Sequence, residues 1–259
     1  MPRFLHYLGI DYSGAGAPDQ PLPGLCAYFA SATGSVRKLK PEGGGRWSRL
    51  AITQRIIDIL RDSPRTIVGI DHGFSFPDRY FERHSIPRNW DAFLQDFAAH
   101  WPSDRHALRT IREGHAGSAA KRQGDATWKR ACERASSSAK SVFLFDVNGT
   151  VAHSTHTGLA HLLRIRRELP EVHFWPFDGW KPRADRSVVL EAYPRLYSDS
   201  YASGTRTGDE HDAYAIARWM RDLDAADELS GVLEPDVSPE DGALGVHEGW
   251  ILGIGARAK

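Results

Sequence analysis

The chain has 259 residues, long enough for one large domain or two small ones, and its hydrophobic content of 41% supports an ordinary globular core. The 33 Lys and Arg residues balance the 33 Asp and Glu residues, which excludes a global electrostatic field that would draw the protein onto nucleic acid or a membrane. Any site for a polyanion must therefore be a local patch.

The N-terminal segment 3–11 (RFLHYLGID) predicts a strand that begins almost at once and leaves no room for a signal peptide. No apolar run approaches the length of a membrane span. Cys26 and Cys132 are too far apart for a zinc ribbon or a disulfide framework, which indicates a reducing compartment. We therefore expect a cytoplasmic protein with no membrane partner.

The next segments predict a hairpin, a helix and a buried strand. Residues 24–32 (GLCAYFASA) and 35–40 (SVRKLK) are typical of a hairpin partner and an edge strand. Residues 47–64 have apolar side chains near helical spacing, and a proline ends this helix. The apolar segment 65–71 (RTIVGID) follows the helix, so we expect a parallel, central strand there.

The second half of the chain predicts a helical insertion and a return to the sheet. Residues 78–140 are polar and helical, and we interpret them as an insertion in a single domain that spans 1–259. The predicted elements after the insertion are a core strand at 141–147, a helix at 157–169, strands at 171–177 and 186–194, and a closing helix that begins at Thr207, where Glu210 completes a capping box.

Two aspartates end predicted strands that we expect to be neighbours. Asp11 ends the first strand, and Asp71 ends the strand at 65–71. Gly9 and Gly69 precede them and remove side chains that would otherwise separate the two backbones. We therefore expect the two carboxylates to lie side by side.

Two further acids extend this pattern. Glu191 ends or nearly ends the strand before Pro194, and Asp212 points along the buried stripe of the last helix. Asp209 ranks below Asp212 because it is a plausible cap or first-turn residue. Buried charges need a partner such as a metal ion, a basic residue or a proton. An oxygen-only set of ligands suits Mg²⁺ or Mn²⁺ rather than zinc.

Each acid also has a simpler interpretation when it is taken singly. An aspartate after a strand commonly caps the following turn or helix, which is the better interpretation for Asp11 alone. Glu191 could pair with Arg183 or Arg195. The conjunction of three strand-end acids and one on a packed helix favours a dense anionic pocket instead.

Several short motifs carry a resemblance to a known family. In chain order they are GIDYSGA, VGIDHGFSFP, WPF, VVLEAYPRLY, DEHDAYAIARW and EGWILG. Together they resemble a large family of predicted nucleases with an RNase H-like fold, the domain of unknown function 429 family, over nearly the whole chain. The resemblance implies an α/β fold with a five-stranded mixed sheet flanked by helices, its first strand central, and a metal site at Asp11, Asp71, Glu191 and Asp212.

Such a site would hydrolyse the phosphodiester bonds of DNA or RNA with two divalent ions about 4 Å apart. Asp11 would bridge the ions, Asp71 and Glu191 would each hold one ion or its waters, and Asp212 would complete the shell. His72 and a group of basic residues near Trp128 are weaker candidates for substrate contacts, although a solvated helix face is the simpler interpretation of the basic group. The basic residues are Lys121, Arg122, Lys129 and Arg130.

Residues 143–151 (FLFDVNGTV) resemble the nucleophile motif of haloacid-dehalogenase-type phosphatases, in which a strand ends in Asp-x-Asp-Gly-Thr. Asn148 replaces the second acid, so we interpret Asp146 as a strand-end or turn residue. His153, His156 and His161 are close together in the sequence, but no cysteine or other converging ligand is spaced to complete a closed zinc site with them. Loop hydrogen bonding is the better interpretation of these histidines.

Two other classes of protein remain as alternatives to the nuclease. A non-catalytic protein with the same fold, which binds nucleic acid or another partner, agrees with the neutral net charge. An actin-like ATPase also begins with a strand-end aspartate and a glycine-containing turn, but 259 residues with one sheet are short for two such lobes.

Overall fold

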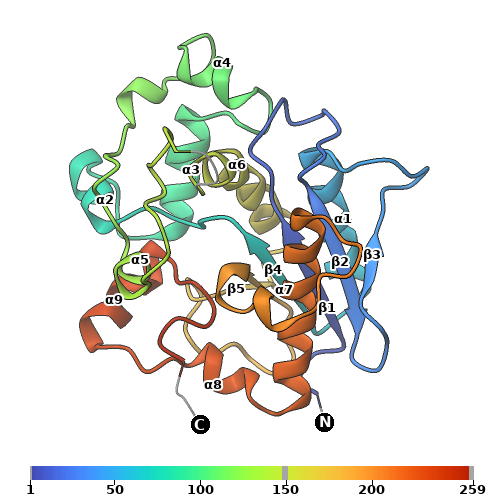
Figure 1. Cartoon of the computed structure of the whole chain (residues 1–259). Coiled ribbons are helices and arrows are strands. Elements are labelled where there is room, and N and C mark those ends of the chain that lie inside the picture. Colours follow the sequence, from blue (N-terminus) through green and yellow to red (C-terminus); the bar gives the residue numbers. More distant parts are fainter. Residues whose placement is uncertain (1, 148–150, 257–259) are drawn as a thin grey trace.

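The computed structural model describes residues 2–147 and 151–256. Within them, a six-stranded mixed sheet is flanked by helices, and Figure 1 shows its arrangement. The strand order is β3-β2-β1-β4-β6-β5. The strands are β1 (His6–Asp11), β2 (Cys26–Ser31), β3 (Arg37–Leu39), β4 (Thr66–Asp71), β5 (His173–Phe174) and β6 (Val188–Glu191).

The pairing confirms the predicted hairpin and the predicted parallel strand. β2 pairs antiparallel with β1 and with the edge strand β3. β4 lies between β1 and β6 and is parallel to both. The apolar sequence of β4 follows from this position, because a strand inside a parallel region is covered by helices on both faces.

The number of strands differs from the five that the resemblance implies, because the short strand β5 extends the sheet beyond β6. The backbone N–H of His173 donates to the carbonyl of Ser187 at 2.9 Å, and that of Trp175 donates to the carbonyl of Val189 at 3.0 Å. The next carbonyl in this alternating pattern, that of Glu191, accepts instead from the backbone N–H of Leu252 at 3.1 Å, so the pairing with β5 does not continue.

Helices cover both faces of the sheet. In Figure 1, α7 lies in front of the sheet, and α1 and α6 lie behind it. Leu8 and Ile10 of β1 belong to the core on the α1 and α6 side, whereas Tyr7 belongs to the core on the α7 side. The α-helices are α1 (Arg49–Asp62), α2 (Asp78–His84), α3 (Trp90–His100), α4 (Leu108–Arg112), α5 (Ala131–Ala135), α6 (Ala152–Glu168), α7 (Gly208–Ala225), α8 (Leu229–Leu233) and α9 (Pro239–Glu248), and short 3-10 turns are η1 (Ala119–Lys121), η2 (Pro194–Leu196) and η3 (Ser198–Ser200).

Capping residues account for the starts of α1 and α7. Ser48 accepts a hydrogen bond from the backbone N–H of Ala51 at the start of α1. Thr207 and Glu210 form the predicted capping box at the start of α7. α7 is not the closing helix, however, because α8 and α9 follow it. No helix in the described part of the chain is long and apolar enough to cross a membrane.

The strand expected at 141–147 is wrong, because these residues form turns and bends. Phe143 packs against Phe76 and Tyr80, with ring centroids 4.5 Å and 5.6 Å apart. The apolar run is therefore buried among aromatic side chains rather than in the sheet. The helix expected at 157–169 begins earlier, at Ala152, because the polar residues of its first turns are buried instead of lying in a loop.

Asp224 is a buried acid that ties the N-terminus of the chain to α7. Its carboxylate accepts hydrogen bonds from the backbone N–H groups of Arg3 (2.9 Å) and Phe4 (2.8 Å) and from the Tyr7 hydroxyl (2.6 Å). A truncated side chain would leave all three donors without this acceptor, two of them in a buried environment.

We expect Asp224→Ala to lower the free energy of unfolding by about 2 to 4 kcal/mol, because each unsatisfied buried donor carries a desolvation penalty. Urea unfolding checks this value. Asp62→Ala removes an exposed acid at the end of α1 and should change stability by less than about 0.5 kcal/mol. Equal effects of the two substitutions would contradict the structural role of Asp224.

Candidate functional site

The two strand-end aspartates lie side by side, as the sequence predicts. Asp11 is in register with Asp71 at the ends of the parallel strands β1 and β4. Neighbouring strands are about 4.8 Å apart, so carboxylates on the same face are within reach of one shared ligand. Both side chains are half-buried.

The glycines before these aspartates have a different role from the expected one. A Cβ atom at Gly9 would lie 2.3 Å from the carbonyl oxygen of Ala213, and a Cβ atom at Gly69 would lie 2.7 Å from the Ile216 side chain. The glycines therefore make room for α7 and not for the neighbouring strand. Because alternate residues of a strand share a face, Asp11 also faces α7.

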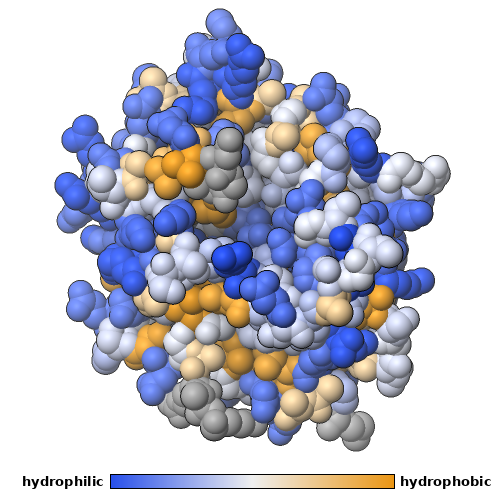
Figure 2. Space-filling model, viewed as in Figure 1, coloured by the Kyte–Doolittle hydropathy of each residue, from blue (hydrophilic) through white to orange (hydrophobic). Residues whose placement is uncertain are grey.

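The close approach of α7 brings its first turns toward these carboxylates. Asp212 immediately precedes Ala213, the residue that contacts Gly9. Asp212 is half-buried, and Asp209, one turn earlier, is exposed. Asp209 and Asp11 line one hollow of about 420 Å³, together with Ser13. In Figure 2, hydrophilic residues border a recessed area near the centre of this face.

Burial and crowding make these carboxylates hard to ionise. Burial raises the pKa of Asp11 well above its usual value, and the nearby charges of Asp71, Asp209 and Asp212 raise it further. The pKa of Asp71 rises to about 8, first from burial and then from Asp212 and Glu191. Burial also raises the pKa of Asp212, against the opposing effects of His211 and a hydrogen bond from Ser198. At neutral pH the cluster therefore favours a bound proton or a cation.

Glu191 ends β6, as predicted, but it leaves the sheet on the opposite face. It is in register with Ile70 rather than with Asp71. Its side chain therefore points to the α1 and α6 side, and its two oxygens accept hydrogen bonds of 2.6 Å and 2.7 Å from the Arg130 guanidinium. The partner is neither Arg183 nor Arg195. This ion pair is fully buried, so Glu191 has the basic partner that a buried acid requires.

Arg130 is the centre of a buried network that the sequence did not predict. Its Nε donates to Glu133 at 2.8 Å, and both side chains are about 1% exposed. Glu248 adds a third buried acid, whose carboxylate accepts from the backbone N–H groups of Ala131 and Asp78 at the first residues of α5 and α2. The network therefore fixes these two helices against the end of β6. A small cavity of about 60 Å³ is lined both by this network and by Asp71.

Tyr197 is a residue near the acids that sequence reasoning missed. Its hydroxyl is buried and lacks a hydrogen-bond partner within the described residues. Burial raises the pKa of Tyr197 well above its usual value, and the charges of Asp71 and Asp212 add to this effect. A buried, unsatisfied hydroxyl beside carboxylates is a candidate hydrogen-bond donor to a bound ligand or water. The sequence around Tyr197, three residues after Pro194, contains no pattern that indicates this role.

A magnesium site built on this acid set would have few protein ligands. Among the residues that the structure describes, no three His, Cys, Asp or Glu side chains are grouped closely enough to hold a metal ion. Mg²⁺ commonly binds through one or two carboxylates and retains several waters or substrate phosphates. Asp11 and Asp71 supply two such carboxylates, whereas Glu191 is committed to Arg130.

The weaker candidates for substrate contacts do not form one surface. His72 is buried beneath Gly158, and burial lowers its pKa to about 4. Arg122 forms a bidentate ion pair with Asp96, at 2.7 Å and 2.8 Å. Lys121 and Lys129 are exposed, and Arg130 is buried in the network described above.

The phosphatase-like motif and the nearby histidines have structural surroundings. Asp146 is exposed in a bend rather than at a strand end, and Asn148 lies outside the described residues. His156 and His161 lie on α6 rather than in a loop, and burial lowers the pKa of each to about 3. His153 is half-buried at the edge of the hollow beside Asp11.

Comparisons with known proteins leave the geometry as the main guide to function. No family model, no curated protein and no solved structure matches this chain.

Proposed function

We propose that this protein is a divalent-metal-dependent nuclease with an RNase H-like fold, whose site is built on Asp11 and Asp71. The in-register pair of carboxylates at the ends of two parallel strands is the observation that carries the proposal. The sheet supports it as well, because without the two-residue β5 the strand order has five strands with β1 in the middle, as the resemblance implies.

Asp11 and Asp71 would hold Mg²⁺ or Mn²⁺, and Asp212 would accept hydrogen bonds from the waters of the ion. A bound ion supplies a polarised water and positive charge for the phosphate oxygens. Without a cation, the crowded carboxylates of Asp11, Asp71, Asp209 and Asp212 would repel a phosphodiester. Binding of the anionic substrate would therefore require the cation. Asp209, at the exposed rim, would have a secondary role.

Glu191 does not belong to this revised ligand set. Its two carboxylate oxygens are occupied by Arg130, and one of them also accepts the backbone N–H of Phe74 at 3.1 Å. Its contribution would be to position the loop after β4, and thereby Asp71.

We expect the purified protein to cleave DNA or RNA with Mg²⁺ or Mn²⁺, and we expect Asp11→Asn and Asp71→Asn to abolish cleavage. Each substitution keeps the side-chain volume but removes a charge that holds the ion. The measurement is cleavage of labelled single- and double-stranded substrates, with Asp19→Asn as a control at an exposed loop acid. Full activity in excess chelator, or in both site variants, would refute the proposal.

A non-catalytic binding protein with the same fold is the second candidate. The ion pair between Glu191 and Arg130 favours it, because this pair removes one of the four expected acids from the metal site. Binding of nucleic acid without cleavage under any divalent ion would select this alternative.

A further inference from the structure

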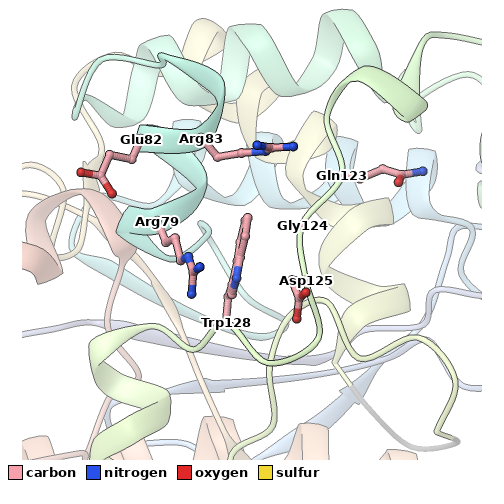
Figure 3. Close-up of a pocket in the computed structure, with 7 residues that line it drawn as sticks. All are labelled: Arg79, Glu82, Arg83, Gln123, Gly124, Asp125 and Trp128. Carbon is pink, nitrogen blue, oxygen red and sulfur yellow. The ribbon is translucent and has the colours of Figure 1, made fainter.

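Two adjoining hollows lie on either side of one tryptophan, at the surface between α2 and the segment before α5. The first has a volume of about 530 Å³ and the second about 500 Å³. Trp128 and Arg79 line both hollows, so the two spaces share one wall. Arg83 lines the first, and Lys129 and Arg134 line the second. Figure 3 shows the first hollow, with Trp128 standing between α2 and the neighbouring loop.

The arginines of α2 are available to a ligand. Arg79 and Arg83 are one helical turn apart, and both extend from α2 toward Trp128 in Figure 3. The Arg79 guanidinium lies 5.1 Å from the centroid of the Trp128 ring. Within the described residues, neither arginine has an ion pair or a hydrogen bond to its side chain.

Within the described residues, the acids of the same hollow form no ion pair with these arginines, although the charge of Arg79 is among the weaker causes that lower the pKa of Asp125. Asp125 directs its carboxylate to its own loop, where Oδ1 accepts the Thr127 backbone N–H at 2.8 Å and the Thr127 hydroxyl at 2.6 Å. Glu82 points away from Trp128 in Figure 3. The site therefore combines an aromatic face with unpaired guanidinium groups.

A ligand that matches this combination is both flat and anionic. A nucleobase stacks on an indole ring, and a phosphate pairs with a guanidinium. The first hollow, lined by Trp128 and both arginines, suits one nucleotide of a single strand, whereas the second is also lined by the acids Asp78, Glu240 and Glu248. The paired bases of a duplex are stacked on each other, so their faces are not free to contact a ring set in a hollow.

We infer that Trp128, Arg79 and Arg83 form a binding site for single-stranded nucleic acid, in which a base stacks on Trp128 and the backbone phosphates contact the two arginines. The inference rests on the proposed function for the class of substrate. It assigns substrate contacts to Arg79 and Arg83 of α2, in place of the paired Arg122 and the buried Arg130.

Fluorescence anisotropy of a labelled oligothymidylate tests this site in the presence of chelator, where cleavage does not occur. We expect Trp128→Ala to weaken binding by about 5- to 100-fold, because one stacked base is lost. Arg83→Ala should reduce the slope of log affinity against log salt by about 0.7, the contribution of one phosphate contact to a single strand. Arg46→Ala, at an exposed arginine in the loop before α1, is the matched control and should leave affinity and slope unchanged.

Trp128→Phe keeps an aromatic face and should retain most of the affinity, which separates stacking from a general loss of structure. Unchanged affinity in Trp128→Ala and Arg83→Ala would overturn the inference, as would binding of duplex DNA in preference to the single strand. Displacement of the oligonucleotide by inorganic phosphate as efficiently as by a nucleotide would overturn the stacking contact. Binding in chelator, followed by no cleavage when Mg²⁺ or Mn²⁺ is added, would leave this site intact and refute only the nuclease, because the binding assay does not depend on the metal.

Discussion

The metal-free protein is expected to lose stability as the pH rises from about 4 to about 8, and Asp71→Asn is expected to remove the part of this loss that Asp71 contributes, while the buried Asp11 retains its own part. The pKa of Asp71 rises from 3.8 to about 8 in the folded protein. Between these values the folded protein retains a proton that the unfolded chain releases, so stability falls with increasing pH. The loss is complete only above the folded pKa.

The size of this effect is on the order of 4 kcal/mol, because one pKa unit corresponds to about 1.4 kcal/mol and partial exposure of the carboxylate reduces the full figure. Asparagine carries no charge at any pH, so metal-free Asp71→Asn should be more stable than the wild type at pH 8 or above. Most substitutions of half-buried residues have the opposite sign.

Urea unfolding in chelator at pH 5 and at pH 8.5 measures this difference. Asp19→Asn, at an exposed loop acid, is the control and should follow the wild type at both values. If Asp71→Asn loses as much stability as the wild type over this interval, the aspartate does not carry the pH dependence.

Added metal should offset much of this loss in the wild type and should stabilise Asp71→Asn less. At pH 8.5, Mn²⁺ at a hundredfold over its dissociation constant should stabilise the wild type by about 2.7 kcal/mol. Asp71→Asn should gain clearly less, because one of the two proposed ligands is neutral. An equal gain in both proteins would place the bound ion elsewhere.

Removal of the buried arginine should have a comparably large effect, with no relation to metal. Arg130→Met is expected to lower the free energy of unfolding by about 3 to 5 kcal/mol. The substitution leaves Glu133 and Glu191 in a dry environment without their cation. A buried carboxylate that loses its cation retains most of its desolvation penalty, because the remaining backbone hydrogen bonds do not neutralise its charge.

A double variant separates the lost charge from the lost packing. Arg130→Met combined with Glu191→Met replaces the ion pair with apolar side chains, and we expect it to recover part of the stability that Arg130→Met loses. Lys129→Met, at the exposed neighbour, should change stability by less than about 0.5 kcal/mol. If the double variant loses more free energy of unfolding than the two single variants lose together, the shape of these side chains, and not their charge, maintains this region.

Local sequence patterns were sufficient to locate the ends of the central strands. Apolar runs that stop at Asp11 and Asp71 placed both aspartates correctly, because a strand in a parallel region is buried along its length and ends where the chain turns to solvent. The capping box at Thr207 and Glu210 placed the start of α7 in the same way, since its hydrogen bonds join residues only three positions apart.

The register of the strands decided which acids meet, and no local pattern contains it. A shift of one position turns a side chain to the other face of a sheet, and the pairing of Glu191 with Ile70 directed this acid to Arg130 instead of to Asp71. Glu191 and Arg130 are 61 residues apart in the chain.

The sequence by itself determined the central strands, the strand-end carboxylates and the need of these buried charges for a partner, because these follow from burial and from hydrogen bonds between near neighbours. Only the tertiary structure decided which partner each charge has. Gly9 admits α7 to the face that carries Asp11, while Arg130 reaches Glu191 on the other face. Both outcomes depend on packing between segments distant in the chain, where sequence spacing sets no distance.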